Sequence, residues 1–451
     1  QTVVVGAPFE SHAQGEGAVH VFQHAHGQWL AQARLQPEPG IEVGLFGWRV
    51  ALSGQGGALA VGSRDGSAAS GPGSVHVFAR QTGRWAPTAR LQAGAPGAGD
   101  GFGHSLAFAA DGATLAVGAR PADAVRSGQP AHAGGVHVFA HQARGWAPVA
   151  QLLATDAPSF HAVSTEVALA ANGQRLVVGV HGPAGTSSEV RVFDLAQGQW
   201  RQSATLQSSG VAWGFGERLS LSADGQRLVA GASMSGGPLG AIHVFEHRGG
   251  EWVLEWSQQD PFPWTEQDGW REFGWKVAMS GDGTTLVVGA DLEAGDASGV
   301  NGDQDRNGLP GAGAVYVFSR TAAGWTQQAY LKAPQPESGA GFGMSVALSD
   351  DGHTVAVGAP FETHAQGEGA VHVFRRTHGH WLAQARLLPA PGGEARLFGA
   401  RVALAGEGAA LAVGAQEGPV HSAHGSVHVF AQGAGRWTPS ARLEATSRSR
   451  G

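Results

Sequence analysis

The hydrophobic and polar positions along the chain recur in a unit of four predicted strands. In the copy that shows it best, these strands cover residues 346–349, 354–358, 370–374 and 381–387. The second strand is apolar at nearly every position, which is typical of a strand buried on both faces of its sheet. Turn residues with Gly separate it from the first strand and predict a tight hairpin. We label the strands A to D and expect four-stranded antiparallel sheets, or blades, that neighbouring sheets cover on both faces.

Three sequence markers set the register of this repeat. Phe-Gly precedes strand A and begins at Phe46, Phe102, Phe215, Phe273, Phe342 and Phe398, with Val163-Ser164 in the equivalent place. A glycine ends strand B at Gly6, Gly62, Gly118, Gly179, Gly231, Gly289, Gly358 and Gly414. A tryptophan marks strand D at Trp29, Trp85, Trp146, Trp200, Trp252, Trp325, Trp381 and Trp437. The mean period of about 59 residues suits a four-stranded propeller blade and is too long for an ankyrin or leucine-rich repeat.

The markers divide the chain into a part-blade and seven full blades, which we expect to form one all-β propeller domain. The part-blade, residues 1–36, has strands B, C and D only. Blades 1 to 7 are predicted over residues 46–93, 102–153, 163–207, 215–256, 273–332, 342–388 and 398–445. The alternative is an eight-bladed ring with one incomplete blade.

A longer repeat is also present, because residues 2–36 and 354–388 are identical at 28 of 35 positions. Packing pressure alone does not explain shared loop sequences such as Gly-Ala-Pro-Phe-Glu. The identity indicates a duplication six blades long or a window of a longer array. No leader peptide opens the sequence, and residues 1–5 fall inside a predicted strand, so we expect a leader to be missing.

The composition excludes several classes of protein. The 72 Gly and 22 Pro among 451 residues are incompatible with a mainly helical fold. A net charge of −7 without a basic run excludes the electrostatic footprint of a nucleic-acid-binding protein. The absence of Cys excludes disulfides and thiolate metal sites. No apolar stretch is long enough for a transmembrane helix, so we expect no membrane insertion.

The repeat resembles the FG-GAP repeats of integrin α-subunit propellers. The likeness rests on Phe342-Gly343, which is followed by Val357-Gly358-Ala359-Pro360. Bacterial FG-GAP proteins with Val-Tyr-Val-Phe strands are more similar still, as at residues 313–318. The resemblance implies a seven-bladed propeller that is extracellular or on the cell surface, with the periplasm as an alternative, and that binds partners. The part-blade departs from the family pattern.

Strand order predicts that the B–C loops and the D–A links between blades share one face of the fold. These segments vary in length and content, whereas the A–B and C–D turns are short, so we expect binding on the B–C and D–A face. Aromatic and acidic residues concentrate around blades 4 and 5, most of them in the D–A link that follows blade 4. The candidate binding residues are Trp213, Trp256, Trp264, Trp270, Asp260, Glu266 and Asp268. Such a cluster suits sugar stacking or a protein hot spot, unless the link buries its own aromatics.

The B–C loop of blade 5 places oxygen-bearing side chains at alternate positions. Its candidate calcium ligands are Asn301, Asp303, Asp305 and Asn307. Hard cations prefer clustered carboxylate and carbonyl oxygens, so Ca²⁺ is the candidate cofactor. A distal Glu is missing and Arg306 interrupts the loop, which leaves a solvated turn as the alternative.

No catalytic motif stands out. The chain lacks Gly-x-Ser-x-Gly, His-Glu-x-x-His and a Walker loop. Strand C carries His in six copies, and we expect these rings to pack rather than to share a metal. The six histidines are His20, His76, His137, His243, His372 and His428.

These observations predict a non-enzymatic, exported binding or adhesion scaffold that recognises a protein or glycan through the B–C and D–A face. One alternative is a structural subunit of a larger array or filament that assembles through the part-blade. A propeller hydrolase or lyase is the other.

Overall fold

Every described element is a β-strand, and the strands pair in the predicted order A-B-C-D. The computed structural model describes residues 2–12, 15–25, 28–38, 43–65, 73–93, 101–119, 134–152, 162–181, 188–208, 214–233, 240–261, 271–364, 367–390, 395–417 and 424–444. The chain divides into two compact units, unit 1 up to residue 207 and unit 2 from residue 208 to residue 444. The predicted all-β class with four-stranded antiparallel sheets is confirmed. Among the described residues there is no helix long and apolar enough to cross a membrane.

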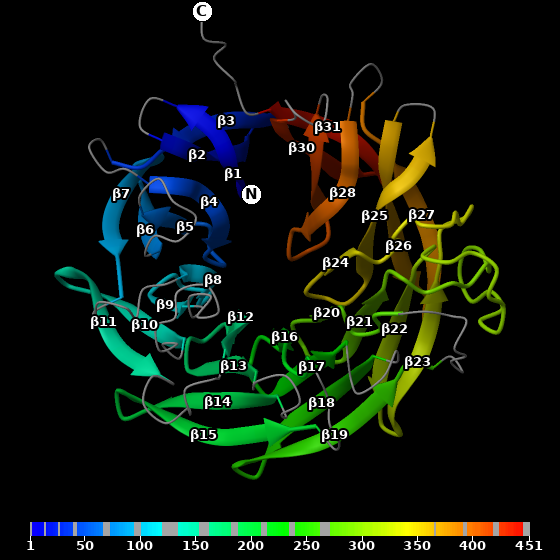
Figure 1. Cartoon of the computed structure of the whole chain (residues 1–451), viewed down its shortest axis with the longest axis horizontal. Coiled ribbons are helices and arrows are strands. Elements are labelled where there is room, and N and C mark those ends of the chain that lie inside the picture. The colour runs from blue at the N-terminus through cyan, green and yellow to red at the C-terminus, as the bar shows by residue number, and fades with distance from the viewer. Residues whose placement is uncertain are drawn as a thin grey trace, which may run out of the picture. The chain divides into compact units, whose positions relative to one another are not determined.

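Unit 1 contains one seven-stranded sheet and two four-stranded sheets (Figure 1). The larger sheet comprises β1 (Thr2–His12), β2 (Gly15–Ala25), β3 (Gln28–Leu35), β4 (Val43–Leu52), β5 (Ala58–Asp65), β6 (Gly73–Gln81) and β7 (Arg84–Leu91). The others are β8 (Phe102–Phe108), β9 (Thr114–Ala119), β10 (Gly135–Gln142) and β11 (Gly145–Leu152), then β12 (Ala162–Leu169), β13 (Arg175–His181), β14 (Glu189–Ala196) and β15 (Gln199–Gln207). A short parallel pairing of β2 with β4 joins the part-blade to blade 1.

Unit 2 contains four separate four-stranded sheets. Blade 4 is β16 (Arg218–Leu221), β17 (Arg227–Ala232), β18 (Ala241–Arg248) and β19 (Glu251–Gln259), and blade 5 is β20 (Lys276–Met279), β21 (Thr285–Ala290), β22 (Ala314–Thr321) and β23 (Gly324–Leu331). Blade 6 is β24 (Ser345–Leu348), β25 (Thr354–His364), β26 (Gly367–Thr377) and β27 (His380–Leu387), and blade 7 is β28 (Ala395–Leu404), β29 (Ala410–Glu417), β30 (His424–Gly433) and β31 (Arg436–Glu444).

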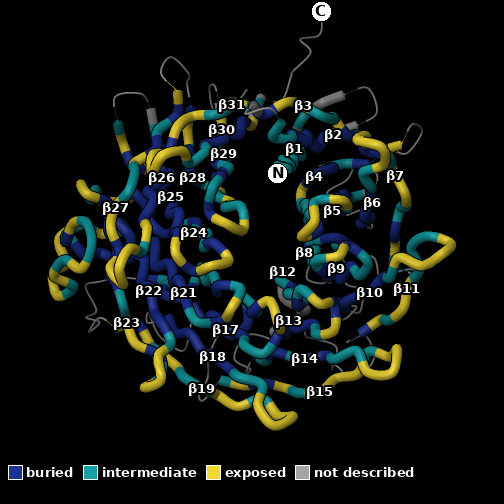
Figure 2. The backbone as a smooth tube through the Cα atoms, turned by 180° about the vertical axis from the view of Figure 1, so that it is seen from behind, coloured by how far each residue is buried: buried dark blue, intermediate teal, exposed yellow. Residues whose placement is uncertain are grey.

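The hydrophobic core lies between the faces of consecutive sheets within each unit. Strands B and C are buried along most of their length, as β21 and β22 show in Figure 2, whereas strand D alternates between covered and exposed positions. The cluster between blades 5 and 6 combines Val287 and Val315 with Val355 and Val357, all fully buried. Burial on both faces accounts for the continuous apolar pattern of strand B.

The glycine markers are explained by close backbone contacts between consecutive blades. A Cβ atom at Gly358, which ends strand B of blade 6, would lie 2.0 Å from the carbonyl oxygen of Gly399 in blade 7. A Cβ atom at Gly369 would lie 2.3 Å from the carbonyl oxygen of Phe398. Since real Cβ atoms do not approach an oxygen so closely, the Phe-Gly marker and the strand B glycine belong to one contact between neighbouring blades.

A β-bulge in strand D adds a side-chain contact between some blades. In blade 6, Phe374 pairs with Ala383 and Val373 with Ala385, so Gln384 is left over as the bulged residue. Its Oε1 accepts a 2.8 Å hydrogen bond from the indole of Trp437 in blade 7. The same bond joins Gln32 to Trp85 and Gln328 to Trp381, and Glu255 to Trp325. The bulge therefore re-aims a side chain toward the strand D tryptophan of the next blade.

The A–B turns of consecutive blades are joined by backbone hydrogen bonds. In unit 2 these bonds run from Ala223 N to Gly281 O, from Gly281 N to Asp350 O and from Asp350 N to Gly406 O. The turn carboxylates are used locally, since Asp282 Oδ1 accepts from the backbone N–H of Thr284. This end of the blades is therefore regular, and the variable segments lie at the other end.

Candidate functional site

The variable segments of blades 5 and 6 form one hydrogen-bonded surface, which we call the blade 5/6 platform. It comprises the B–C loop 291–313, the D–A link 332–341 and the B–C hairpin end 358–364. Three backbone hydrogen bonds of 2.8 to 3.0 Å join the B–C loop to the D–A link and the start of blade 6. They run from Gly339 N to Pro310 O, from Gly341 N to Gly311 O and from Phe342 N to Ala312 O. A B–C loop and a D–A link thus lie together, as the strand order predicts.

The hairpin of blade 6 is held to the same link. Phe361 N donates to Ala340 O at 3.2 Å. Glu337 Oε2 accepts from both the backbone N–H and the hydroxyl of Thr363, at 3.0 and 2.6 Å. All three segments lie inside the continuously described range 271–364, and their backbone bonds fix them relative to one another.

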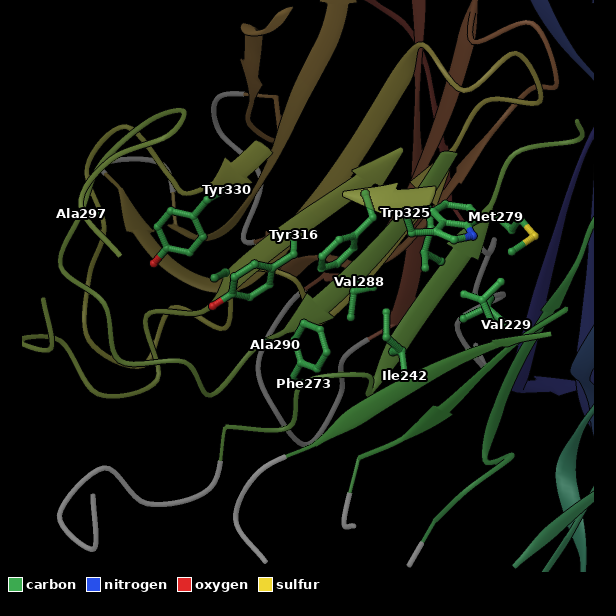
Figure 3. Close-up of a cluster of buried hydrophobic side chains, with 14 residues drawn as sticks. Val229, Ile242, Phe273, Met279, Val288, Ala290, Ala297, Tyr316, Trp325 and Tyr330 are labelled. Atoms are coloured by element: carbon green, nitrogen blue, oxygen red, sulfur yellow. The ribbon is translucent and has the colours of Figure 1, made fainter. Parts of the chain in front are cut away.

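A buried glutamate anchors the B–C loop of blade 5. Glu293 Oε2 lies 2.7 Å from Lys332 Nζ, and Glu293 Oε1 accepts from the hydroxyl of Tyr330 at 3.0 Å. All three residues have 0 % relative exposure. In Figure 3 the hydroxyl ends of Tyr316 and Tyr330 point to the same side of the hydrophobic cluster, the side on which Ala297 lies. Breaking such a pair would leave a buried charge unmatched, so the loop is fixed at its base.

The same low-dielectric surroundings shift the pKa values of the anchor. Burial lowers the pKa of Lys332, although the Glu293 carboxylate opposes this effect. Burial raises the pKa of the Tyr330 phenol, and the neighbouring Glu293 charge raises it further. Tyr330 therefore stays protonated and acts as a hydrogen-bond donor.

Buried glutamates occupy the same position in two other blades, four residues after the strand B glycine. In blade 6, Glu362 accepts from His372 Nε2 and Arg386 Nε, both at 2.7 Å. In the part-blade, Glu10 contacts His20 and Arg34 in the same way. Tyr316 and Tyr330, the only two tyrosines of the chain, replace the strand C histidine and strand D arginine in blade 5. The anchor is therefore a repeated element of the B–C loops that sequence reasoning missed.

The anchor turns the preceding apolar side chain toward solvent. Leu292 precedes Glu293 and is 38 % exposed, and Phe361 precedes Glu362 and is 42 % exposed. The Phe361 ring lies beside Gly341, where a Cβ atom would come within 3.3 Å of its Cδ2. The platform therefore presents two apolar side chains on segments that are fixed by buried ion pairs. In the sequence, the signal for this anchor is a Glu four residues after the glycine that ends strand B.

The predicted calcium residues are all described, and three of the four side chains already accept hydrogen bonds from other residues of the chain. Asn301 Oδ1 accepts from the backbone N–H of Tyr330 at 2.9 Å, and Asn307 Oδ1 accepts from Arg271 at 2.8 Å. Asp303 Oδ1 accepts from the backbone N–H of Asp305 at 3.0 Å, as in an Asx turn. Within the described ranges no three His, Asp or Glu side chains are grouped to hold a metal ion. Calcium binding here stays a prediction that rests on Asp303 and Asp305.

The predicted aromatic site is only partly described. Trp256 is partly buried and packs against the core, 5.0 Å from the ring of Phe318 and stacked on Trp325 at 6.0 Å. Asp260 is buried at 7 % exposure. The remaining candidates lie outside the described residues; they are Trp213, Trp264, Trp270, Glu266 and Asp268. A ligand site on this link therefore stays a prediction.

Five of the six strand C histidines pack against a marker phenylalanine, and His20 of the part-blade stacks on Phe22 instead. The five rings meet the marker phenylalanines edge-on or tilted at 5.1 to 5.4 Å, as His243 does with Phe215 at 5.3 Å. Tyr316 occupies the same position against Phe273. Burial lowers the pKa of His243 to about 4, so this ring is neutral near pH 7.

A further group of carboxyls lies around the Phe-Gly markers of blades 4 and 5. Burial raises the pKa values of Glu217, Glu272 and Asp291, and the charges of Asp291 and Glu217 add to the effect at Glu272. Arg218 lies over the Trp275 ring at 4.5 Å beside them. Raised carboxyl pKa values are a property that general acids share with structural clusters.

Comparison with known proteins identifies the repeat. The model of the FG-GAP repeat matches residues 265–318 and 325–374, which include the blade 5/6 platform. The chain contains FG-GAP repeats. No curated protein is similar to it in sequence.

Solved structures similar to this FG-GAP repeat chain are β-propellers. Sqt1 of Chaetomium thermophilum bound to the N-terminus of ribosomal protein L10 has a TM-score of 0.51 and 14 % identity, over 87 % of this chain and 86 % of that one. A eukaryotic initiation factor has a TM-score of 0.50 and 12 % identity, over 98 % and 87 %. A periplasmic gluconolactonase of Pseudomonas aeruginosa has a TM-score of 0.49 and 17 % identity, over 86 % and 96 %. At these identities the likeness shows the propeller fold alone.

Proposed function

We propose that this protein is a non-enzymatic interaction scaffold that binds a protein partner through the blade 5/6 platform. The observation that carries the proposal is the pair of exposed apolar side chains, Leu292 and Phe361, each next to a buried glutamate. A partner that covers them pays little ordering entropy, because the loops are already fixed. Aromatic and aliphatic side chains on a rigid surface are the usual anchors of protein interfaces.

The fold supports this proposal in a general way. Sqt1, a propeller of similar fold, is described as bound to a segment of a ribosomal protein. Variable loops on a rigid scaffold commonly carry binding residues. We further propose an extracellular or cell-surface location and an adhesive role, both on the resemblance to integrin α-subunits. A glycan is the alternative ligand.

The test is a selection of displayed peptides and protein domains on the wild-type chain, with a glycan array in parallel. Each binder is then measured on the double variant Leu292→Asp/Phe361→Asp. We expect at least tenfold weaker binding, because two charges replace the apolar anchors. The matched control is Leu30→Asp/Leu382→Asp, which changes leucines that are 49 % and 55 % exposed on strand D.

The proposal is contradicted if the binders bind the platform variant as tightly as the wild type. It is also contradicted if the strand D control weakens their binding by the same factor. A glycan ligand in place of a protein would be recognised by array signals that the platform variant abolishes.

A hydrolase is the second candidate, favoured by the raised carboxyl pKa values at Glu217 and Glu272. A panel of esters, lactones and glycosides tests it with Glu272→Gln. Turnover that disappears in this variant, while the fold is kept, would replace the scaffold proposal.

A further inference from the structure

Three carboxyl groups lie near one another between blade 4 and the blade 5/6 platform. They belong to Glu217, Glu272 and Asp291, which we call the carboxyl cluster, and Asp291 is the first residue of the platform. Burial raises the pKa of Glu272, and the charges of Asp291 and Glu217 raise it further. The cations that act on Glu272 are Arg218 and Lys276. The cluster therefore has three carboxyl groups for two positive charges.

The repeat itself does not require these carboxyl groups. Glu272 directly precedes a Phe-Gly marker, Glu217 directly follows one, and Asp291 comes two residues after a strand B glycine. No other copy of the repeat has an acidic residue at any of these positions. Glu272 also has a φ of 52°, whereas blades 4 and 6 have Gly214 and Gly341 in the same place. The acidic side chain is thus present at a backbone conformation that favours glycine.

Asp291 contributes a buried oxygen that lacks a partner. The residue is 7 % exposed, and its Oδ1 atom has no hydrogen-bond partner within the described ranges. Burying an ionised acceptor without a partner is unfavourable, and a nearby positive charge offsets this penalty. Glu217 and Glu272 beside it are only half-buried, so a group from outside the chain can reach them.

The cation next to the cluster is held mainly by backbone and by an aromatic ring. Arg218 donates from Nε to Trp275 O at 3.1 Å and from Nη1 to Glu217 O at 2.9 Å, and its guanidinium lies over the Trp275 ring. Burial raises the pKa of Glu217 even though the Arg218 charge lowers it. The resident positive charge therefore compensates the carboxyl groups only in part.

The spacing of the carboxyl groups suits an organic cation. In the part of the chain that the structure describes, no three Asp, Glu or His side chains are grouped to hold a metal ion. An ammonium or guanidinium group has several N–H donors and bonds carboxylates at about 2.7 to 2.9 Å, so it can contact acceptors that are further apart than metal ligands.

We propose that the carboxyl cluster receives a lysine or arginine side chain of the protein partner that covers the blade 5/6 platform. This inference rests on the proposed function and specifies the partner as an apolar segment that carries a basic residue. Asp291 and Leu292 are consecutive, so one segment can cover Leu292 and place its cation at the cluster. Asp303 and Asp305 are exposed in the same loop, and their charges favour the same partner.

The probe is a library of displayed peptides selected on the wild-type chain. Peptides that bind Leu292→Asp/Phe361→Asp at least tenfold more weakly are kept, and each Lys or Arg in them is replaced by Met. We expect one such replacement to weaken binding to the wild type about tenfold. The same replacement should weaken binding to Glu272→Gln/Asp291→Asn less than twofold, because the contact is already absent in a double-mutant cycle.

The matched control is Asp303→Asn/Asp305→Asn, which removes the same number of charges from the exposed part of the loop. Against this control the basic residue should keep its roughly tenfold contribution. Glu217→Gln provides a second cluster variant, with a smaller loss of coupling, if the double variant does not fold.

The outcomes separate this inference from the proposed function. Peptides that depend on Leu292 and Phe361 but have no basic residue coupled to the cluster overturn the inference and leave the proposed function intact. Coupling that disappears equally in the Asp303→Asn/Asp305→Asn control overturns it too, because overall negative charge then attracts the partner. If no peptide depends on Leu292 and Phe361, the proposed function fails and this inference fails with it.

Discussion

The part-blade and blade 6 are nearly the same sequence in two different surroundings. Residues 2–36 and 354–388 share 28 of 35 positions, and their strands B, C and D pair in the same registers. Yet Thr354 to Pro360 of strand B are buried in blade 6, whereas the equivalent residues Thr2 to Pro8 are only partly buried in the part-blade. The comparison shows that burial of this strand depends on its neighbours, here strand A, rather than on its own residues.

The strand D tryptophans show the same dependence. Trp381 donates its indole N–H to Gln328 of blade 5 at 2.9 Å. Trp29 is also buried, but its indole nitrogen has no hydrogen-bond partner within the described residues. The Glu–His–Arg anchor, by contrast, is present in both copies, because all of its members belong to strands B, C and D or their loop. Features contained within one blade are therefore present in both copies, whereas the burial of strand B and the indole bond in blade 6 depend on strand A and on the preceding blade 5.

The largest effect is expected from breaking the anchor that the two copies share. Glu362→Gln leaves Arg386 and His372 without their carboxylate, and Glu10→Gln does the same to Arg34 and His20. Losing one member of a buried charge pair costs about 3 to 5 kcal/mol. We expect local stability losses of similar size in both copies, measured by hydrogen exchange of β26 and β2.

The exposed Glu407→Gln variant provides the control and should be neutral. A loss confined to blade 6 would contradict the view that the anchor is independent of strand A. Burial opposes ionisation of Glu362, but bonds from His372 and Arg386 lower its pKa overall. The ionised Glu362 carboxylate should therefore stabilise the fold fully at pH values above the ordinary Glu pKa. This stabilisation should disappear as the pH falls through the lowered pKa of Glu362.

A strand C histidine without a glutamate should respond to acid differently. The Nε2 atom of His243 lies 3.1 Å from the hydroxyl oxygen of Ser208. Burial lowers the pKa of this histidine to about 4. The unfolded chain binds a proton near pH 6.5 and the folded chain only near pH 4. Stability should therefore fall by about 3 kcal/mol as the pH drops across this range.

His243→Tyr should flatten this pH dependence, because Tyr316 packs on its marker phenylalanine at the equivalent position in blade 5. The measurement is urea unfolding at several pH values between 4 and 7. Equal slopes for the wild type and the variant would show that other groups cause the acid sensitivity.

The smallest effect is expected from the tryptophans, and it separates the two copies. Trp381→Phe loses a hydrogen bond to Gln328 Oε1, which still accepts from the Ser319 hydroxyl, whereas Trp29→Phe removes a donor that has no described partner. Both variants lose similar packing area. We expect Trp381→Phe to cost about 0.5 to 1.5 kcal/mol more than Trp29→Phe, measured by hydrogen exchange in the strands around each site. Equal costs would mean that the indole bond contributes nothing.

The periodic pattern was sufficient to predict the strands, their order and the face on which the variable loops meet. Each of these depends on local chemistry: strand B is apolar because it is covered on both sides, and its terminal glycine is required by the backbone of the next blade. The packing of the strand C histidines could also be predicted, since ring spacing between sheets excludes a shared metal.

The site required the tertiary structure. The residues that looked chemically active in the sequence are partly internal, since Asn301 and Asn307 are hydrogen-bonded within the fold and Trp256 packs against the core. The residues that define the platform, Glu293 and Lys332, are 39 positions apart and pair only because a B–C loop folds back on the end of strand D.

The sequence by itself determined the blade, because period, turns and close glycine contacts are properties of short segments. Only the tertiary structure decided which copies of one sequence are fully buried, where the buried charges pair, and which apolar side chains remain exposed. The physical reason is that burial and charge pairing depend on the neighbouring strands, and residues 2–36 and 354–388 differ mainly in those neighbours.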